Sequence, residues 1–247
     1  MARRSVESIG SFFVGYLTRG QSLLDCGCGP GSVTLGFASY LEPGLVVGVD
    51  IGEGDIKRAQ STASDQGIDN VEFQVANAHA LPFQDRSFDA VWSSGMLEHV
   101  APPQTALTEM HRVMKPGGLL GLRGGDFRGH MWTPSSEIDR VMELIATLFQ
   151  LNGADANHGG EQPRLLRETG FEPLDISASY YGMDGRECLE LCRGILLNDQ
   201  NVGVLRDAGL ADEEELSDLL GTCDGWARES DTIFFQAWWE VVAKKPD

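Results

Sequence analysis

The sequence is poor in basic residues. Its 247 residues include 19 lysines and arginines against 37 aspartates and glutamates, a formal net charge of −18 at pH 7. Surfaces that bind nucleic acids or anionic membranes are usually basic, so this charge argues against both as main partners. The imbalance is uneven, because residues 1–152 carry 11 basic and 17 acidic side chains, whereas residues 153–247 carry eight and 20. The composition therefore changes near residue 150.

Long apolar runs and a cysteine framework are also missing. No uncharged stretch reaches the roughly 18 residues of a membrane-spanning helix, and residues 1–10 lack the apolar centre of a secretory signal. The five cysteines are an odd number without the paired spacing of a zinc site, and Cys26 and Cys28 are too close for a routine disulfide. These absences predict a cytoplasmic protein with reduced thiols. The hydrophobic fraction of 42% is ordinary for a globular chain that can bury one sizeable core.

Short apolar runs alternate with helical patterns through the first half. Strands are expected at residues 22–26, 45–50, 71–75, 88–92 and 119–123. Helices are expected at residues 5–18, from the glycines after residue 26 to Leu41, and at residues 55–66 and 106–114. This alternation predicts an α/β fold with a doubly wound, mostly parallel sheet. Such sheets bind ligands at the carboxyl ends of their strands.

Helical patterns dominate the second half. Ser136-x-x-Asp139 resembles a capping box before an amphipathic helix. Further helices are expected near residues 162–169, 185–197 and 212–223, and strands at residues 173–181 and 232–243. About 50 residues between the last two strands are too many for a hairpin loop, so they are expected to form a helical insertion. We predict a single domain over residues 1–247, with a cofactor-binding core at about 20–130 and a helical cap, or lid, at about 131–170 and 182–231.

The most informative segment is Leu23-Leu24-Asp25-Cys26-Gly27-Cys28-Gly29-Pro30-Gly31. Its glycines let the backbone approach a ligand closely, and Asp50 at the end of the next strand could accept hydrogen bonds from ribose hydroxyls. A dinucleotide loop needs G-x-G-x-x-G, but the third position falls on Ser32 or Thr34. Asp25 would repel a phosphate and could engage an ammonium group. The loop therefore favours a nucleoside ligand without pyrophosphate, such as S-adenosylmethionine.

These residues resemble the first motif of class I S-adenosylmethionine-dependent methyltransferases, in the branch of ubiquinone/menaquinone-biosynthesis-like enzymes. Other segments that resemble the family are residues 46–51, 76–83, 88–92 with 96–100, and 109–118. The similarity covers about residues 20–123 in consistent order. It implies a Rossmann-like sheet of seven strands, the last of them antiparallel.

The resemblance also implies a binding site for S-adenosylmethionine. Its expected members come from four segments: Asp25, Gly27, Cys28, Gly29 and Gly31; Asp50 and Ile51; Asn77 and Ala78; and Ser93. Asp25, Gly27 and Gly29 would lie near the methionine part. Asp50 would hold the ribose and Ile51 would pack beside the adenine, while Asn77 and Ala78 would lie at its amino edge. The family often has aspartate at position 77, but an asparagine carbonyl can still accept from an amine.

Histidines after the fourth and fifth strands are candidates for proton removal. Methyl transfer is an in-line displacement that needs a base only for a hydroxyl or carbon-acid acceptor. His99 is the predicted base because an unperturbed imidazole titrates near pH 6.5, and the alternative is a histidine bonded to backbone. His130 is a predicted substrate contact or second base, or else a solvated loop residue. Trp132 and Tyr181 are predicted to line an acceptor pocket, with core packing as the alternative.

No metal site is predicted. Some relatives hold a divalent ion through Glu-x-x-Glu-His, and here Gly95 stands at the first position before Glu98-His99. The sequence therefore predicts a methyltransferase that acts on oxygen or carbon of a small molecule. Two other functions are compatible with it: an S-adenosylmethionine-binding protein that does not methylate, and a nucleotide-dependent oxidoreductase on a related sheet.

Overall fold

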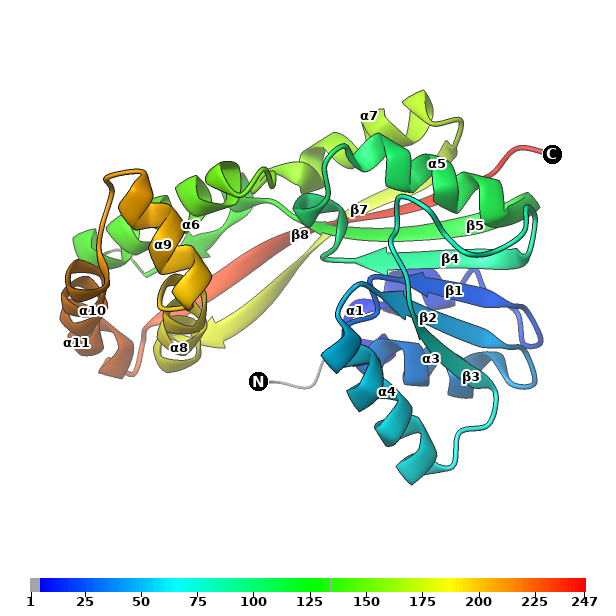
Figure 1. Ribbon diagram of the computed structural model, residues 1–247, viewed down its shortest axis with the longest axis horizontal. Coiled ribbons are helices and arrows are strands. Elements are labelled where there is room, and N and C mark those ends of the chain that lie inside the picture. The colour runs from blue at the N-terminus through cyan, green and yellow to red at the C-terminus, as the bar shows by residue number, and fades with distance from the viewer. Residues whose placement is uncertain (1–4, 134) are drawn as a thin grey trace. The chain divides into compact units, whose positions relative to one another are not determined.

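The computed structural model describes residues 5–133 and 135–247 (Figure 1). The chain forms two compact units. Unit 1 comprises Met1–Gly124, His158–Ala178 and Trp239–Asp247, and unit 2 comprises Gly125–Asn157 and Ser179–Trp238.

Unit 1 is built on a parallel sheet. Its first five strands are β1 (Leu23–Cys26), β2 (Val46–Asp50), β3 (Val71–Val75), β4 (Phe88–Ser94) and β5 (Met114–Gly125). They lie in the order β3-β2-β1-β4-β5, and each neighbouring pair is parallel. The chain then adds β8 (Ile233–Lys244) beside β5, and β7 (Glu172–Asp184) pairs with β8. The order reverses between β1 and β4, where the carboxyl ends of a doubly wound sheet bind ligands.

Helices cover both faces of this sheet (Figure 1). One face carries α1 (Val6–Ile9), α2 (Ser11–Val14), α3 (Ser32–Leu41) and α4 (Glu53–Gln66), and the other carries α5 (Pro103–Val113) and α7 (His158–Glu168). Successive residues of β1 divide between the two cores, as the two-residue period of a strand requires. Leu24 packs in the cluster that contains Leu107 of α5, whereas Leu23 packs in the cluster of Phe13 and Phe37.

Unit 2 is mainly helical. Its helices are α6 (Ser136–Leu151), α8 (Gly185–Leu196), α9 (Asp199–Asp207), α10 (Glu213–Thr222) and α11 (Asp224–Arg228). A 3-10 turn, η2 (Phe127–Gly129), precedes the short strand β6 (Met131–Trp132), which pairs antiparallel with β8. The amphipathic helices bury one apolar core that includes Ile138, Leu189 and Leu216.

The predicted α/β Rossmann-like fold is confirmed, with corrections. Among the described residues the sheet has eight strands and not seven, because the chain adds β6. The predicted helix over residues 5–18 is two short helices that meet at Gly10. The predicted cap segment 131–170 extends too far, since α7 belongs to unit 1. Leu165 and Leu166 of α7 are buried in the core that lines β1 and β4.

The predicted capping box at Ser136 is wrong. Ser135 is the residue before α6, and its side chain makes no capping hydrogen bond. Asp139 instead accepts a hydrogen bond from Trp132 Nε1 at 2.7 Å. The acidic run that starts at Asp212 does cap α10, because Asp212 and Glu215 form a reciprocal capping box.

None of the helices in residues 5–133 and 135–247 combines the length and apolar character that crossing a membrane requires.

Candidate cofactor site

The loop between β1 and α3 has glycines in the left-handed region at three positions. The φ angles of Gly27, Gly29 and Gly31 are 84°, 51° and 81°. A Cβ at Gly27 would lie 2.5 Å from Met96 Cγ, and one at Gly31 would lie 2.8 Å from Ala59 Cβ. A Cβ at Gly29 would meet nothing within 4 Å. Gly27 and Gly31 are therefore required by packing, whereas Gly29 borders open space from which a ligand can reach the backbone.

Asp50 ties this loop to the loop after β2. The Gly29 N–H donates to Asp50 Oδ2 at 2.9 Å, and the Gly52 N–H donates to Oδ1 at 2.8 Å. These two bonds fix the carboxylate beside the open face of Gly29. Because an ionised carboxylate has about four acceptor sites, each oxygen can still accept a hydroxyl.

Asp25 is a buried acid behind the loop. It is 2% exposed, and Thr34 Oγ1 donates to its Oδ2 at 2.6 Å. Loss of solvation raises the pKa of Asp25 to about 7, the Thr34 hydrogen bond opposes this rise, and the negative charge of Asp50 adds to it. A cation bound near this group would favour its ionised form.

The two thiols of the loop are turned into the protein. Cys26 is fully buried, and Cys28 Sγ lies 3.1 Å from the position of a Cβ on Gly48. Burial raises the pKa of both thiols well above the ordinary range. The Cys28 N–H donates to Val49 O at 3.0 Å. These thiols are therefore neutral, and Cys28 packs against the cluster between α3 and α4.

Apolar side chains are exposed after β2 and at the end of β3. Ile51, directly after β2, is 74% exposed, and Val75, the last residue of β3, is 50% exposed. In the next loop, Asn77 Oδ1 accepts a hydrogen bond from the His79 N–H at 2.9 Å, and the Ala80 N–H donates to Asn77 O at 3.0 Å. The carboxyl edge thus presents an apolar surface next to an ordered polar turn, which suits a heteroaromatic ring.

Polar side chains are buried at the carboxyl end of β4 and beside β5. Ser93 Oγ, Ser94 Oγ and Gln162 Oε1 have no hydrogen-bond partner among the described residues. A Cβ on Gly124 would lie 2.1 Å from Gln162 Nε2, so this carboxamide of α7 lies against the end of β5. Unpaired buried polar groups cost about 1–3 kcal/mol each and commonly mark a place for a bound polar group. No pattern in the sequence singles out Gln162.

Arg123 and Glu240 form a buried ion pair in unit 1. Arg123 Nε lies 3.4 Å from Glu240 Oε1, and their side chains are 3% and 11% exposed. Ser177 Oγ donates to Glu240 Oε2 at 3.4 Å, and the Gly95 N–H donates to Arg123 O at 2.9 Å. These contacts hold the charged groups of Arg123 and Glu240 in place beside the end of β4. Arg123 and Glu240 each interrupt an otherwise apolar strand pattern, and this interruption is the feature of the sequence that could have identified them.

His99 ends the 3-10 turn η1 (Leu97–His99), which follows β4. Its backbone N–H donates to Met96 O at 2.9 Å, and its side chain is at the surface. Partial loss of solvation lowers the pKa of His99 below its ordinary value, so the imidazole is mainly neutral at pH 7. The predicted base therefore lies at the same edge of unit 1 as the glycine loop, in a state that can accept a proton.

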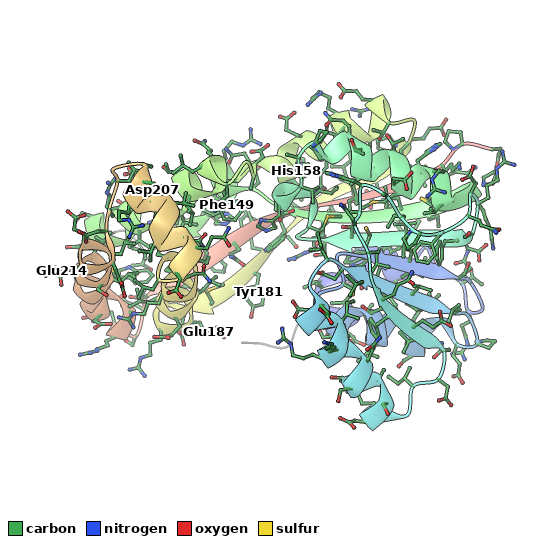
Figure 2. All side chains as sticks on the ribbon, in the orientation of Figure 1. Phe149, His158, Tyr181, Glu187, Asp207 and Glu214 are labelled. Atoms are coloured by element: carbon green, nitrogen blue, oxygen red, sulfur yellow. The ribbon has the colours of Figure 1, made fainter. Side chains whose placement is uncertain are left out.

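The three predicted substrate residues lie in unit 2. His130 Nδ1 is 2.8 Å from Asp126 O, and its ring stacks on Phe127 with centroids 4.5 Å apart. Trp132 stacks on Phe234 at 5.9 Å. Tyr181 lies on the part of β7 that belongs to unit 2 (Figure 2) and packs against the same core. Trp132 and Tyr181 pack against the apolar core of unit 2, whereas His130 contacts the Asp126 carbonyl and the Phe127 ring. The role of all three toward a substrate stays a prediction.

Known proteins resemble the chain in sequence. The family described as methyltransferase domain matches residues 24–122. An uncharacterized methyltransferase of Schizosaccharomyces pombe, C1B3.06c, is 34% identical over 100% of this chain and 92% of its own length. The chain belongs to the methyltransferase family. The resemblance to class I S-adenosylmethionine-dependent enzymes is thereby confirmed.

Other relatives of this methyltransferase have more specific names. The ubiquinone/menaquinone biosynthesis C-methyltransferase UbiE of Cronobacter sakazakii is 42% identical over 68% of this chain and 71% of that protein. The 27-O-demethylrifamycin SV methyltransferase of Amycolatopsis mediterranei is 34% identical over 64% of this chain and 56% of that protein. The similarity therefore spans only about half of the second relative.

Solved structures share the fold at low identity. A putative methyltransferase from Bacillus halodurans has a TM-score of 0.67 and 20% identity, with 96% of this chain and 97% of that chain covered. A Haemonchus contortus phosphoethanolamine N-methyltransferase 2 in complex with S-adenosyl-L-methionine has a TM-score of 0.62 and 22% identity, with 98% of this chain and 52% of that chain covered. At these identities the likeness concerns the fold alone.

Proposed function

We propose that this methyltransferase binds S-adenosylmethionine at the carboxyl edge of β1–β4 and transfers its methyl group to carbon or oxygen of a small molecule. The observation that carries the proposal is the open face of Gly29 beside the anchored Asp50 carboxylate. When bound, the cofactor supplies a methyl group already activated by a sulfonium leaving group. The protein then has to align the acceptor and remove a proton where the acceptor requires it.

The residues present fit this cofactor in charge and polarity. Asp50 offers acceptors for ribose hydroxyls, and the buried acid Asp25 is suited to an ammonium group, directly or through water. Exposed Ile51 offers an apolar face for the adenine, and Asn77 and Ala78 would recognise its amino edge. A pyrophosphate would instead meet two carboxylates, which disfavours the dinucleotide of an oxidoreductase.

His99 is the group proposed to remove the acceptor proton. Its lowered pKa keeps it neutral at pH 7, where it can accept a proton from a hydroxyl or an acidic carbon. The names of two relatives support oxygen or carbon as the acceptor atom, since one is a C-methyltransferase and the other acts on a 27-O-demethyl compound. We propose a small molecule as the acceptor, and the strongly acidic chain supports this choice over nucleic acid.

Calorimetric titration with S-adenosylmethionine and, separately, with NADH tests the cofactor. We expect binding of the first in the micromolar range and none of the second. Asp50→Ala should weaken binding about tenfold or more, because each charge-assisted hydrogen bond to the ribose is lost. Asp65→Ala is the matched control, since Asp65 is an exposed acid on α4 of the same unit. Unchanged affinity in Asp50→Ala would contradict the proposed site.

Methyl transfer itself needs a second measurement. Release of S-adenosylhomocysteine in the presence of a mixture of small phenols and quinols should exceed release without them. Binding of S-adenosylmethionine with no acceptor-dependent release from any such mixture would favour a binding protein that does not methylate.

A further inference from the structure

Arg112 of α5 makes hydrogen bonds to the loop that precedes β4. Arg112 Nη1 donates to Phe83 O and to Asp85 Oδ1, each at 2.8 Å, and Nη2 donates to Leu81 O at 3.0 Å. The same guanidinium binds Glu109 in a bidentate pair, with both N–O distances at 2.8 Å. One side chain thereby holds three points of the loop. Its planar fork, which a lysine lacks, makes this possible.

Glu109 completes the attachment of Leu81. The Leu81 N–H donates to Glu109 Oε2 at 2.8 Å, so the pair from α5 binds both the N–H and the carbonyl of one loop residue. The side chains of Arg112 and Glu109 are 30% and 18% exposed, and Leu81 is 4% exposed. The Arg112 hydrogen bonds lower the pKa of Glu109 and keep it ionised. This geometry differs from a solvated surface ion pair, which adds little to stability.

Leu81, which Arg112 and Glu109 hold, follows directly after the turn of residues 77–80 that would recognise the adenine. The Ala80 N–H donates to Asn77 O at 3.0 Å, and at the other end the Ala76 N–H donates to Asp50 O at 2.9 Å. Residues 76–81 are therefore held to β2 at one end and to α5 at the other. The His79 N–H holds Asn77 Oδ1, and the Ala78 N–H makes no backbone hydrogen bond among the described residues.

We propose that Arg112 is a positioning residue for adenine recognition, which it serves by holding residues 76–81 from α5. The inference rests on the proposed function, in which Asn77 and Ala78 recognise the amino edge of the adenine. There Asn77 Oδ1 can accept from the 6-amino group, and the Ala78 N–H can donate to ring N1. Hypoxanthine reverses the hydrogen-bonding character of both positions: its 6-oxo group is an acceptor where adenine has an amino donor, and its N1–H is a donor where adenine has an acceptor. A rigid turn rejects it, whereas a loosened turn can adapt, so Arg112 controls selectivity for the base more than overall affinity.

The test compares two ligands that differ only in the base, S-adenosylhomocysteine and S-inosylhomocysteine, by calorimetry. We expect the wild type to prefer the adenine ligand by about tenfold or more. Arg112→Lys should reduce that preference to about threefold or less, because the loosened turn rejects the hypoxanthine ligand less strongly. Arg164→Lys is the matched control, because the exposed side chain of Arg164 pairs with Glu161 and Glu168 of the same helix and bonds no loop carbonyl among the described residues. It should keep the wild-type preference.

A second variant covers the case in which Arg112→Lys does not fold. Glu109→Gln retains an acceptor for the Leu81 N–H but loses the bidentate pair, and it should give an intermediate preference. Equal weakening of both ligands, with the preference intact, would overturn the inference while leaving the proposed cofactor site standing. A wild type that binds both ligands equally would overturn the inference together with the proposed base contact.

Discussion

The two units bury different kinds of side chain. Most of the polar residues that are buried in the described structure belong to unit 1: Asp25, Thr34, Ser93, Glu98, Arg123, His158, Gln162 and Glu240. Unit 2 buries an apolar core that contains Cys188, Cys192 and Cys223. Burying polar groups lowers stability unless they are paired, so a protein retains them mainly where they serve chemistry. The contrast supports unit 1 as the place of the proposed chemistry.

The surfaces differ as well. Unit 1 carries 13 basic and 19 acidic residues, whereas unit 2 carries six and 18 and contains no lysine. The acidic residues of unit 2 lie largely on helices, and several act in first turns, as Glu213, Glu214 and Glu215 do in α10. Acidic residues at helix N-termini interact favourably with the helix dipole. This charge therefore stabilises helices in unit 2, whereas two carboxylates of unit 1, Asp25 and Asp50, lie near the ends of β1 and β2.

Asp25 gives the sharpest test of the contrast. Its pKa of about 7 in the folded protein lies above the ordinary 3.8, so between about pH 4 and 7 the group ionises in the unfolded chain but stays protonated in the folded protein, and the free energy of unfolding falls as pH rises. Asp25→Asn removes that penalty and should raise the free energy of unfolding by about 2–4 kcal/mol at pH 8, but little at pH 4. Chemical denaturation at both pH values measures this. A variant less stable than the wild type at pH 8 would contradict the assignment.

Cofactor affinity should move in the opposite direction in the same variant. An ammonium group favours the ionised form, so affinity for S-adenosylmethionine should increase in the wild type as pH rises through about 7. Asp25→Asn should bind more weakly and lose this pH dependence. A gain in stability with a loss of binding is the behaviour expected of a functional group in unit 1.

His99→Ala should lower turnover about 100-fold and leave the affinity for S-adenosylmethionine nearly unchanged. The lowered pKa of His99 predicts that kcat/KM for the acceptor, measured at saturating S-adenosylmethionine, rises with pH only below the ordinary histidine range, because the neutral form is the base. This rise of kcat/KM with pH should be absent in His99→Ala. Unchanged turnover would remove His99 as the base.

The glycine loop separates packing from binding within unit 1. Gly27→Ala should lower the free energy of unfolding by about 2 kcal/mol, since its Cβ would meet Met96 and its φ is positive. Gly29→Ala meets no atom, so it should cost about 1 kcal/mol from its backbone conformation and weaken cofactor binding. Denaturant unfolding and calorimetry on both variants check this. Wild-type affinity for the cofactor in Gly29→Ala would contradict the proposal that Gly29 borders the bound cofactor.

The sequence predicted unit 1 better than unit 2 for physical reasons. Buried parallel strands such as β2 (Val46–Asp50) appear in the sequence as nearly continuous apolar runs, and the glycine loop needs its residues at fixed spacing. The short helices α9 and α11 and the two-residue β6 were missed, because so few residues give no clear periodicity and are held by tertiary contacts. The capping of α6 was misassigned by one residue, since Ser135 and Ser136 suit the same position.

The candidate site was predictable only where backbone geometry dictates residue type. Gly27 and Gly31 follow from the loop, and Asp50 from its place after β2. Gln162 and Glu240 were not found, because they come from distant segments that only the folded chain brings to the end of β5. Long-range partners of this kind leave no spacing in the sequence.

Gln162 supplies the smallest predicted effect and tests whether an unpaired group in unit 1 is there for a ligand. Its Oε1 is buried without a partner among the described residues, so Gln162→Met keeps the volume and removes the unpaired polar group. The free energy of unfolding should rise by about 1 kcal/mol while acceptor-dependent turnover falls. Gln60→Met is the control, because Gln60 Nε2 donates to Phe73 O at 2.9 Å and its loss should destabilise the protein. If both variants lose stability alike, the Gln162 carboxamide is structural, and the contrast between the units does not extend to α7.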